Sequence, residues 1–365
     1  MKLILRILKH LQVIRGNIYM KITDKNIAIF KKWYIKDCTV RNKDFFHFSV
    51  RNIKESRKAS VIDENTVTKG EVGIYLDGSP DDCISLQPLK NMGQLYIGSA
   101  SYNSYDEVVC VDDEGYVYSR SCKYDSREKK IPFGIDGPLR NIITKIKNIS
   151  GRLYIVGYNN SVGYRDGVND WQSLCLNLPV FDYSKEKGRF GDEFKLRDID
   201  GFSYDDLYVV GGKGNVWHFS GAEWEQINFP SNIYLETVCC AGDGYVYIGG
   251  QSGILFKGRG NKWEKVSAGG YSLPFEDIVW HAGKVWCTSD YGLWCLDGDT
   301  LIPVDLPSEI AVAVGHLSVG DGVMLMAGMY GAAWHDGQEW HLLINSVEWQ
   351  SDDETDDETD DEAED

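Results

Sequence analysis

The chain contains seven histidines and nine cysteines, the side chains that most often act as metal ligands, nucleophiles and general bases. Neither set has the spacing that such chemistry requires. The histidines form no His-Glu-x-x-His or His-x-His pattern, the cysteines form no Cys-x-x-Cys pair, and no Gly-x-Ser-x-Gly elbow is present. We therefore expect no catalytic, metal or cofactor site. We expect His218, His281 and His335, each next to an aromatic residue, to be structural.

The cysteines lie mostly in strand-like runs among Val, Ile and Trp, where a free thiol packs as a small apolar residue. Cys287 and Cys295 flank the turn at Asp290 and could face each other across a hairpin. Nine cysteines is an odd number without a disulfide spacing, as is usual in a reducing compartment. The sequence thus predicts a cytoplasmic protein with nine free thiols.

A strand, a glycine turn, a second strand and a tryptophan recur with constant spacing. The first strand residue and the tryptophan are 17 or 18 positions apart in four copies: Leu153 to Trp171, Leu207 to Trp224, Val246 to Trp263, and Val323 to Trp340. A fifth copy starts at Val285 and has Ile302 in place of the tryptophan. Consecutive copies are 39, 39 and 38 residues apart from Leu207 onward. A period near 40 with several short strands is typical of propeller blades.

One copy shows the four strands of such a blade: residues 235–240, 245–249, 254–257 and 262–266, separated by glycine-containing turns. Turns every 6–10 residues leave no room for the helices of a solenoid. The predicted fold is therefore an all-β propeller of four-stranded antiparallel blades.

The number of blades is less direct at the N-terminal end. Five copies follow residue 150, one covers residues 90–125, and residues 22–87 hold strand candidates at 26–30, 44–50 and 73–76. This favours seven blades, or six if the first unit only completes the last blade. We expect the terminal strands to share a blade, because this would remove exposed sheet edges. The predicted domains are a basic amphipathic extension (1–20), the propeller (21–349) and a disordered acidic tail (350–365).

The repeated residues have a structural interpretation. Trp171, Trp224, Trp263 and Trp340 are expected to be largely buried between adjacent blades. The glycine pairs that begin at Gly211 and Gly249 are expected in turns that require positive φ.

Residues 1–20 place apolar side chains on one helical face and cations on the other, without a signal-peptide cleavage site. They could be a packing helix, a weak membrane-surface helix, or an extension upstream of a start at Met20. We expect no transmembrane span.

Charge is unevenly distributed along the chain. Residues 1–60 carry +11 and residues 352–365 carry −11, so the stretch between them carries the −17 of the whole chain. The tail repeats Asp-Asp-Glu-Thr and lacks the glycine of a calcium loop. We expect it either to keep the protein soluble or to engage a basic partner or the chain's own Lys31, Lys32, Lys36, Arg51, Arg57 and Lys58. The candidate partner-binding residues are Asp352, Asp353, Glu354, Asp356, Asp357 and Glu358.

The repeat Leu/Val-Tyr-x-x-Gly followed by Gly-x-x-Trp resembles that of a loose class of bacterial propellers over residues 90–345. The Asp-Gly-x-x-Trp phrases at Asp166 and Asp336 are similar to the Asp-box of sialidases, but the rest of that pattern is missing. The Kelch tyrosine and the WD40 dipeptides are missing as well. An acidic, intracellular, non-enzymatic propeller is similar to the immunity proteins that neutralise polymorphic toxins, many of which are basic nucleases.

This resemblance implies an immunity-type inhibitor, monomeric outside its complex, that binds a basic toxin through one face and its long loops at 122–138 and 179–194. The acidity disfavours direct binding of nucleic acid. The alternatives are a scaffold or regulatory propeller, a glycan-acting hydrolase or lyase with its site at the channel mouth, and a carbohydrate-binding propeller.

Overall fold

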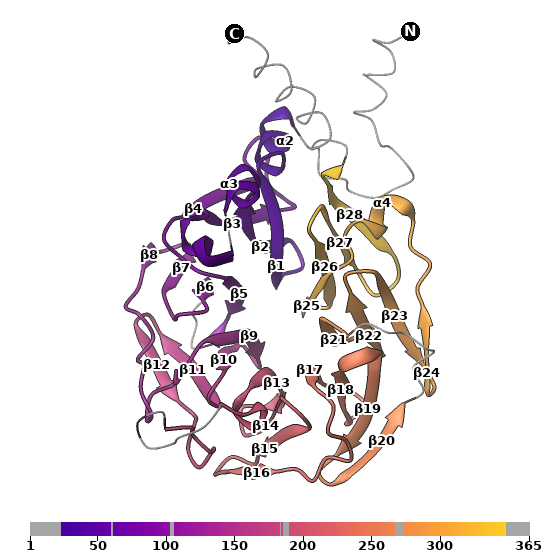
Figure 1. The fold of residues 1–365 in the computed structure, drawn as a ribbon. Coiled ribbons are helices and arrows are strands. Elements are labelled where there is room, and N and C mark those ends of the chain that lie inside the picture. The colour runs from indigo at the N-terminus through magenta and orange to yellow at the C-terminus, as the bar shows by residue number, and fades with distance from the viewer. Residues whose placement is uncertain are drawn as a thin grey trace, which may run out of the picture.

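The computed structural model describes residues 23–59, 61–102, 106–182, 184, 190–266 and 274–347. These residues form seven four-stranded antiparallel sheets arranged as blades around a central axis (Figure 1). Every blade uses four strands that are consecutive in the sequence. The seven-bladed propeller predicted from the repeat is therefore confirmed, and the six-bladed alternative is wrong.

The first three blades contain the following strands: β1 (Trp33–Asn42), β2 (Phe45–Asn52), β3 (Lys69–Tyr75) and β4 (Ile84–Leu89) in blade 1; β5 (Leu95–Ala100), β6 (Glu107–Asp112), β7 (Val117–Ser121) and β8 (Asp125–Arg127) in blade 2; β9 (Ile143–Ile149), β10 (Arg152–Gly157), β11 (Ser161–Gly167) and β12 (Asp170–Ser173) in blade 3.

The last four blades contain β13 (Leu196–Ser203), β14 (Asp206–Gly211), β15 (Asn215–Phe219) and β16 (Trp224–Gln226) in blade 4; β17 (Leu235–Cys240), β18 (Val246–Gly250), β19 (Ile254–Arg259) and β20 (Lys262–Val266) in blade 5; β21 (Asp277–His281), β22 (Lys284–Ser289), β23 (Gly292–Asp297) and β24 (Thr300–Pro303) in blade 6; β25 (His316–Gly320), β26 (Val323–Gly328), β27 (Gly331–His335) and β28 (Trp340–Asn345) in blade 7.

Short helices occur at the edges of the blades: α2 (Asp24–Phe30), α3 (Ile53–Lys58) and α4 (Ser308–Ala311), with 3-10 turns at Val61–Thr66, Asp192–Phe194 and Gln251–Gly253. The strand expected at residues 26–30 is wrong, since α2 covers this stretch. Asn26 and Phe30, four residues apart, are both buried on one side of α2, which is a helical spacing. No helix in the described ranges is long and apolar enough to cross a membrane.

The ring closes without a shared blade, contrary to the expectation for the terminal strands. Blade 1 ends at β4 and blade 7 ends at β28, so neither lends a strand to the other. A common apolar core, including Phe46 and Phe48 from blade 1 and Leu325 from blade 7, joins them. The Ile35 N–H also donates to the Met329 carbonyl at 3.2 Å. Contacts between two complete blades therefore close the ring, and no blade needs to combine strands from both ends of the chain.

The inner strands of the blades all run in the same direction along the central axis. Asp200 accepts from the Cys240 N–H as Asp198 does from the Val238 N–H, so β13 and β17 advance together. The turns after first and third strands therefore lie on one face, which we call the hairpin face. The connections after second and fourth strands form the opposite face.

Candidate functional site

The wall of the central channel is built from a polar position that repeats in the inner strands. At five of the seven seams, a side-chain oxygen of one inner strand accepts a hydrogen bond from a backbone N–H of the next. The pairs are Asp37 with Ile97 (3.2 Å), Asp198 with Val238 (2.9 Å), Thr237 with Ile278 (3.3 Å), Asp277 with Leu317 (3.1 Å) and Ser318 with Val40 (3.0 Å). These bonds hold successive blades in a fixed register.

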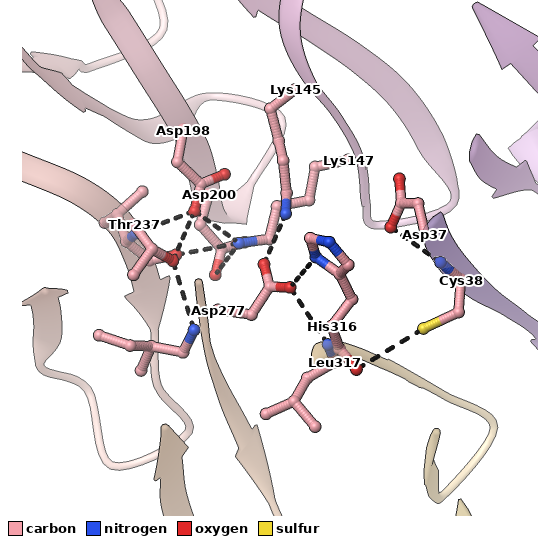
Figure 2. Close-up of polar contacts among 12 residues, drawn as sticks. Asp37, Cys38, Lys145, Lys147, Asp198, Asp200, Thr237, Asp277, His316 and Leu317 are labelled. Atoms are coloured by element: carbon pink, nitrogen blue, oxygen red, sulfur yellow. Dashed lines mark hydrogen bonds and ion pairs between the residues drawn. The ribbon is translucent and has the colours of Figure 1, made fainter. Parts of the chain in front are cut away.

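Two lysines of β9 reach across the channel toward the other inner strands (Figure 2). Lys145 Nζ lies 2.5 Å from Asp277 Oδ1, and the other oxygen of Asp277 lies 3.0 Å from His316 Nδ1. Lys147 Nζ lies 3.4 Å from Asp198 Oδ2 and donates to the Val238 carbonyl at 2.9 Å. Blades 3, 4, 5, 6 and 7 are thereby tied together through charge-assisted contacts.

The protonation of these groups follows from their pairing. Burial would raise the pKa of Asp277, but Lys145 and His316 outweigh it and hold that pKa below its ordinary value. The pKa of Lys145 is correspondingly raised, because the surrounding carboxylates outweigh burial, and Asp277 likewise raises the pKa of His316. Asp37 differs, since burial raises the pKa of its carboxyl. The central pair is therefore Lys⁺ and Asp⁻ at neutral pH.

The channel opens at both ends into hollows. One, of about 620 Å³, lies on the side opposite the hairpin face and is lined by Lys36, Arg51, Gln94, Arg197 and Glu276 among others. The second, of about 270 Å³, lies on the hairpin side, and Asp37 and Lys145 line both. Within the described ranges, no group of three or more His, Cys, Asp or Glu side chains is placed to hold a metal ion. The charged channel residues instead make the contacts between blades that are described above.

These channel residues were not among those expected from the sequence. A signal was present, because Asp198 and Asp277 occupy the same place in copies two periods apart. A charged residue that recurs at one position of an otherwise apolar strand indicates a conserved geometric role within the repeat. Only the three-dimensional structure shows that Lys145, from another blade, points at Asp277.

The hairpin face has a strongly acidic character. Its fourteen turns carry only two basic residues, Lys43 and Lys123. The same turns carry twelve acidic residues: Asp44, Asp77, Asp81, Asp82, Asp106, Asp205, Glu223, Asp243, Asp299, Asp321, Asp336 and Glu339. All of these except the half-buried Asp44 are exposed. The connections of the opposite face are longer and carry charges of both signs.

Exposed aromatic residues accompany the acids in blades 4 and 5. Tyr204 is 64% exposed and Tyr245 is 46% exposed, next to Asp205 and Asp243. Arg259 of blade 5 contacts Asp206 of blade 4 at 2.6 Å, which places the two sets of turns side by side. Exposed tyrosines within a charged surface are typical of protein-binding sites.

The four repeat tryptophans lie at seams between blades. Trp171 and Trp224 are buried, at 5% and 1% exposure, in cores shared with the preceding blade. Trp263 and Trp340 pack against such cores but are half-buried rather than largely buried. The Trp224 indole donates to the Leu174 carbonyl of the preceding blade, whereas the Trp263 indole donates to the Gly260 carbonyl of its own turn.

The repeat glycines only partly meet the expectation of positive φ. Gly212 has φ of 41°, but Gly211, Gly249 and Gly250 have ordinary backbone conformations. A Cβ at Gly211 would collide with the Lys195 carbonyl, and one at Gly249 would lie 2.7 Å from Ile278 Cδ1. Close packing against an inner strand, that of its own blade at Gly211 and that of the next blade at Gly249, excludes side chains there rather than turn geometry.

The candidate partner-binding residues Asp352, Asp353, Glu354, Asp356, Asp357 and Glu358 lie outside the described residues, as does the extension at 1–20. The cysteines are described, and all nine are free thiols. Cys287 pairs with Trp294 and Cys295 with Trp286, so the two thiols point to opposite faces of their sheet.

No protein-family model matches the chain. It is 25% identical over 307 residues to the immune protein Tsi7 of Pseudomonas aeruginosa, a match that covers 82% of this chain and 94% of Tsi7. The chain is a distant homologue of an immunity protein. The match therefore extends over most of this chain and nearly the whole of Tsi7.

Solved structures show the same fold at low sequence identity. The WD40 propeller domain of Doa1 superposes with a TM-score of 0.50 at 10% identity, covering 81% of this chain and 90% of that one. YCF48 bound to D1 peptide gives 0.50 at 14% identity, with coverage of 82% and 90%. The extracellular domain of BT4673 from B. thetaiotaomicron gives 0.55 at 14% identity, and the match covers 87% of this chain but 39% of that longer one.

Proposed function

We propose that this protein is an immunity protein that neutralises a toxin by binding it as a folded, non-enzymatic partner in the cytoplasm. The observation that carries the proposal is the similarity to the immune protein Tsi7 along nearly the whole of both chains. The propeller supports it, since a rigid ring of seven blades offers two broad faces for another protein.

The proposed docking surface is the part of the hairpin face formed by blades 4 and 5. It comprises Tyr204, Asp205, Glu223, Asp243 and Tyr245, which we call the acidic docking patch. Asp205 lies against the turn that holds Glu223, because a Cβ on Gly221 would be 3.2 Å from Asp205 Cβ. The patch thus combines two exposed tyrosines with three exposed carboxylates.

The chemistry of this patch favours a cationic protein. Carboxylates accelerate the encounter with a basic partner and orient it, and the tyrosines supply apolar contact area with little loss of side-chain entropy. The twelve-to-two excess of acids over bases in the turns of this face extends this field beyond the patch itself. We infer that the protein is a monomer until it meets the toxin.

The function is tested by co-expression with the toxin domain encoded beside this chain's gene. The protein should restore growth of a bacterial host that produces the toxin, and the two purified proteins should form a stable complex. Growth arrest in the presence of well-expressed, folded protein would contradict the immunity function. A regulatory propeller would bind another protein and leave the toxin active.

The docking surface is tested with matched variants in the same complex. Asp205→Asn, Glu223→Gln and Asp243→Asn together should lower the association rate about three- to tenfold at low salt. The control set is Glu276→Gln, Asp290→Asn and Asp305→Asn, which neutralises three exposed acids of the opposite face. Tyr204→Ala should speed dissociation, whereas Tyr291→Ala, at an 80% exposed position of the opposite face, should not. The reverse pattern would move the toxin to the opposite face.

A further inference from the structure

Blade 1 carries a patch of cations on a protein whose remaining surface is mostly acidic. The patch, which we call the blade 1 basic patch, comprises Lys31, Lys32, Lys36, Lys54, Arg57 and Lys58. It joins two helices and the start of β1, because the Ile53 N–H at the beginning of α3 donates to the Lys32 carbonyl just after α2. The end of α2 and the start of α3, which carry or adjoin five of the six residues, therefore lie next to each other beside the start of β1.

Four lysines of this patch have no ion-pair partner among the described residues. Lys32, Lys36, Lys54 and Lys58 are exposed, and none of the four forms an ion pair with any residue that the structure describes. Glu64, in the turn that follows α3, already contacts Arg51 and Lys69, each at 3.1 Å. The Glu55 carboxylate accepts hydrogen bonds from Thr68. The patch thus retains uncompensated positive charge.

The described chain ends next to this patch. The Ser346 N–H donates to the Tyr330 carbonyl at 2.8 Å, and the Tyr330 ring lies 5.7 Å from the ring of Tyr34 on β1. The described chain thus ends close to β1, the strand that carries Lys36. Residues 352–365, with eleven acidic side chains and no basic one, begin only a few residues later in the sequence. The linker of four residues, 348–351, spans roughly 10–12 Å on average.

Tethering favours this segment over any free polyanion. A segment attached by a short linker has an effective concentration in the millimolar range at a site within its reach. A separate anion must approach against the −17 charge of the residues between the two charged ends. The charge of the tail, −11, exceeds the charge of the six cations in the patch, so the complex is anionic overall.

We propose that the acidic segment 352–365 docks on the blade 1 basic patch. Bound there, it covers the main cationic surface of the propeller and leaves the acidic docking patch on the hairpin face as the dominant charged surface. This inference does not depend on the proposed function, since it concerns two parts of one chain.

Zero-length carbodiimide cross-linking of the full chain tests the proposal, because it joins carboxylates only to amines in direct contact. Peptides from the tail should be linked to Lys32, Lys36, Lys54 and Lys58 at 20 mM salt, and the yield should fall about fivefold or more at 500 mM salt. Mixing ¹⁴N- and ¹⁵N-labelled protein should give no mixed-label links, as expected for contact within one chain.

The control lysines are Lys262, Lys265 and Lys284, which are exposed and lie in blades 5 and 6. They should give few links to the tail, and the triple variant Lys32→Gln, Lys54→Gln, Lys58→Gln should lose most of the blade 1 links. Links spread evenly over all lysines, or links to Lys2, Lys9 and Lys21 instead, would overturn the proposal. Loss of the blade 1 links on addition of a DNA duplex at low ratio would assign the patch to nucleic acid.

Discussion

Asp277 is the residue on which the channel network depends most heavily. Its carboxylate contacts Lys145 Nζ at 2.5 Å and His316 Nδ1 at 3.0 Å, and it accepts from the Leu317 N–H at 3.1 Å. Asp277→Asn keeps the shape of the side chain but removes the charge. Lys145, whose side chain is 18% exposed, then loses its closest counter-charge, a loss that costs up to about 3–5 kcal/mol in proteins.

The expected shift in melting temperature follows from the size of the ring. An unfolding entropy of about 2.1 cal/mol/K per residue over roughly 320 ordered residues gives about 0.7 kcal/mol/K, so the variant should melt about 4–7 °C lower. The control is Asp290→Asn, an exposed acid of the opposite face, which should change the melting temperature by less than about 1 °C. Differential scanning calorimetry of both variants makes the comparison.

The pH dependence provides a second readout. Since Lys145 and His316 hold the pKa of Asp277 below its ordinary value, the stabilisation is present above pH 4 and is lost as the pH falls through the lowered pKa. The difference between wild type and Asp277→Asn should therefore be constant near pH 5 and shrink below pH 4. In a double-mutant cycle, Lys145→Met should cost much less in the Asp277→Asn background than in wild type. Additive effects, or a variant as stable as the control, would refute the assigned role of the network.

Three further predictions concern stability and the thiols. His281 Nε2 lies 3.0 Å from His335 Nδ1, and burial together with this neighbour lowers the pKa of His281 to about 4. The folded state should therefore lose stability as the pH falls from about 6.5 toward 4, and His281→Gln should flatten that loss in urea titrations; a steeper slope would contradict the role given to this histidine pair. Trp224→Ala should cost about 4–5 kcal/mol and Trp263→Ala about 2–3 kcal/mol, because only Trp224 is fully buried, and equal costs would argue against the seam assignment. A thiol reagent should react quickly with Cys122 in the native protein and with nine cysteines after unfolding without reductant, whereas a count near one would indicate disulfides.

The repeat predicted the architecture because each blade is formed by strands that are close to one another in the sequence. Each unit near residues 207–340 pairs strands that are neighbours in the sequence, so spacing and turn glycines are enough to define it. Blade 1 lacks the tryptophan phrase, and the spacing could not distinguish the helix at Asp24–Phe30 from a strand in a seven-residue stretch with three isoleucine or phenylalanine residues. The way in which the ring closes could not be predicted from the sequence either. It depends on an apolar core that Phe46 and Leu325 share, although they are almost 280 residues apart.

The candidate site was less predictable than the fold. The acidic docking patch combines turns of two blades, and which turns share a face follows only from the direction of every strand. Asp205 and Asp243 look like ordinary turn residues in the sequence. Lys145 and Asp277 are 132 positions apart and meet only because the ring brings β9 opposite β21. The acidic tail, by contrast, stood out from composition alone.

Hydrogen exchange of the complex with the toxin tests the central claim most directly. Binding at the acidic docking patch should slow exchange at the amides of residues 204–206, 220–223 and 241–245, and leave the turns at 290–291 and 329–330 of the opposite face unchanged. Protection of the opposite face with no change at Tyr204 and Tyr245 would contradict the account.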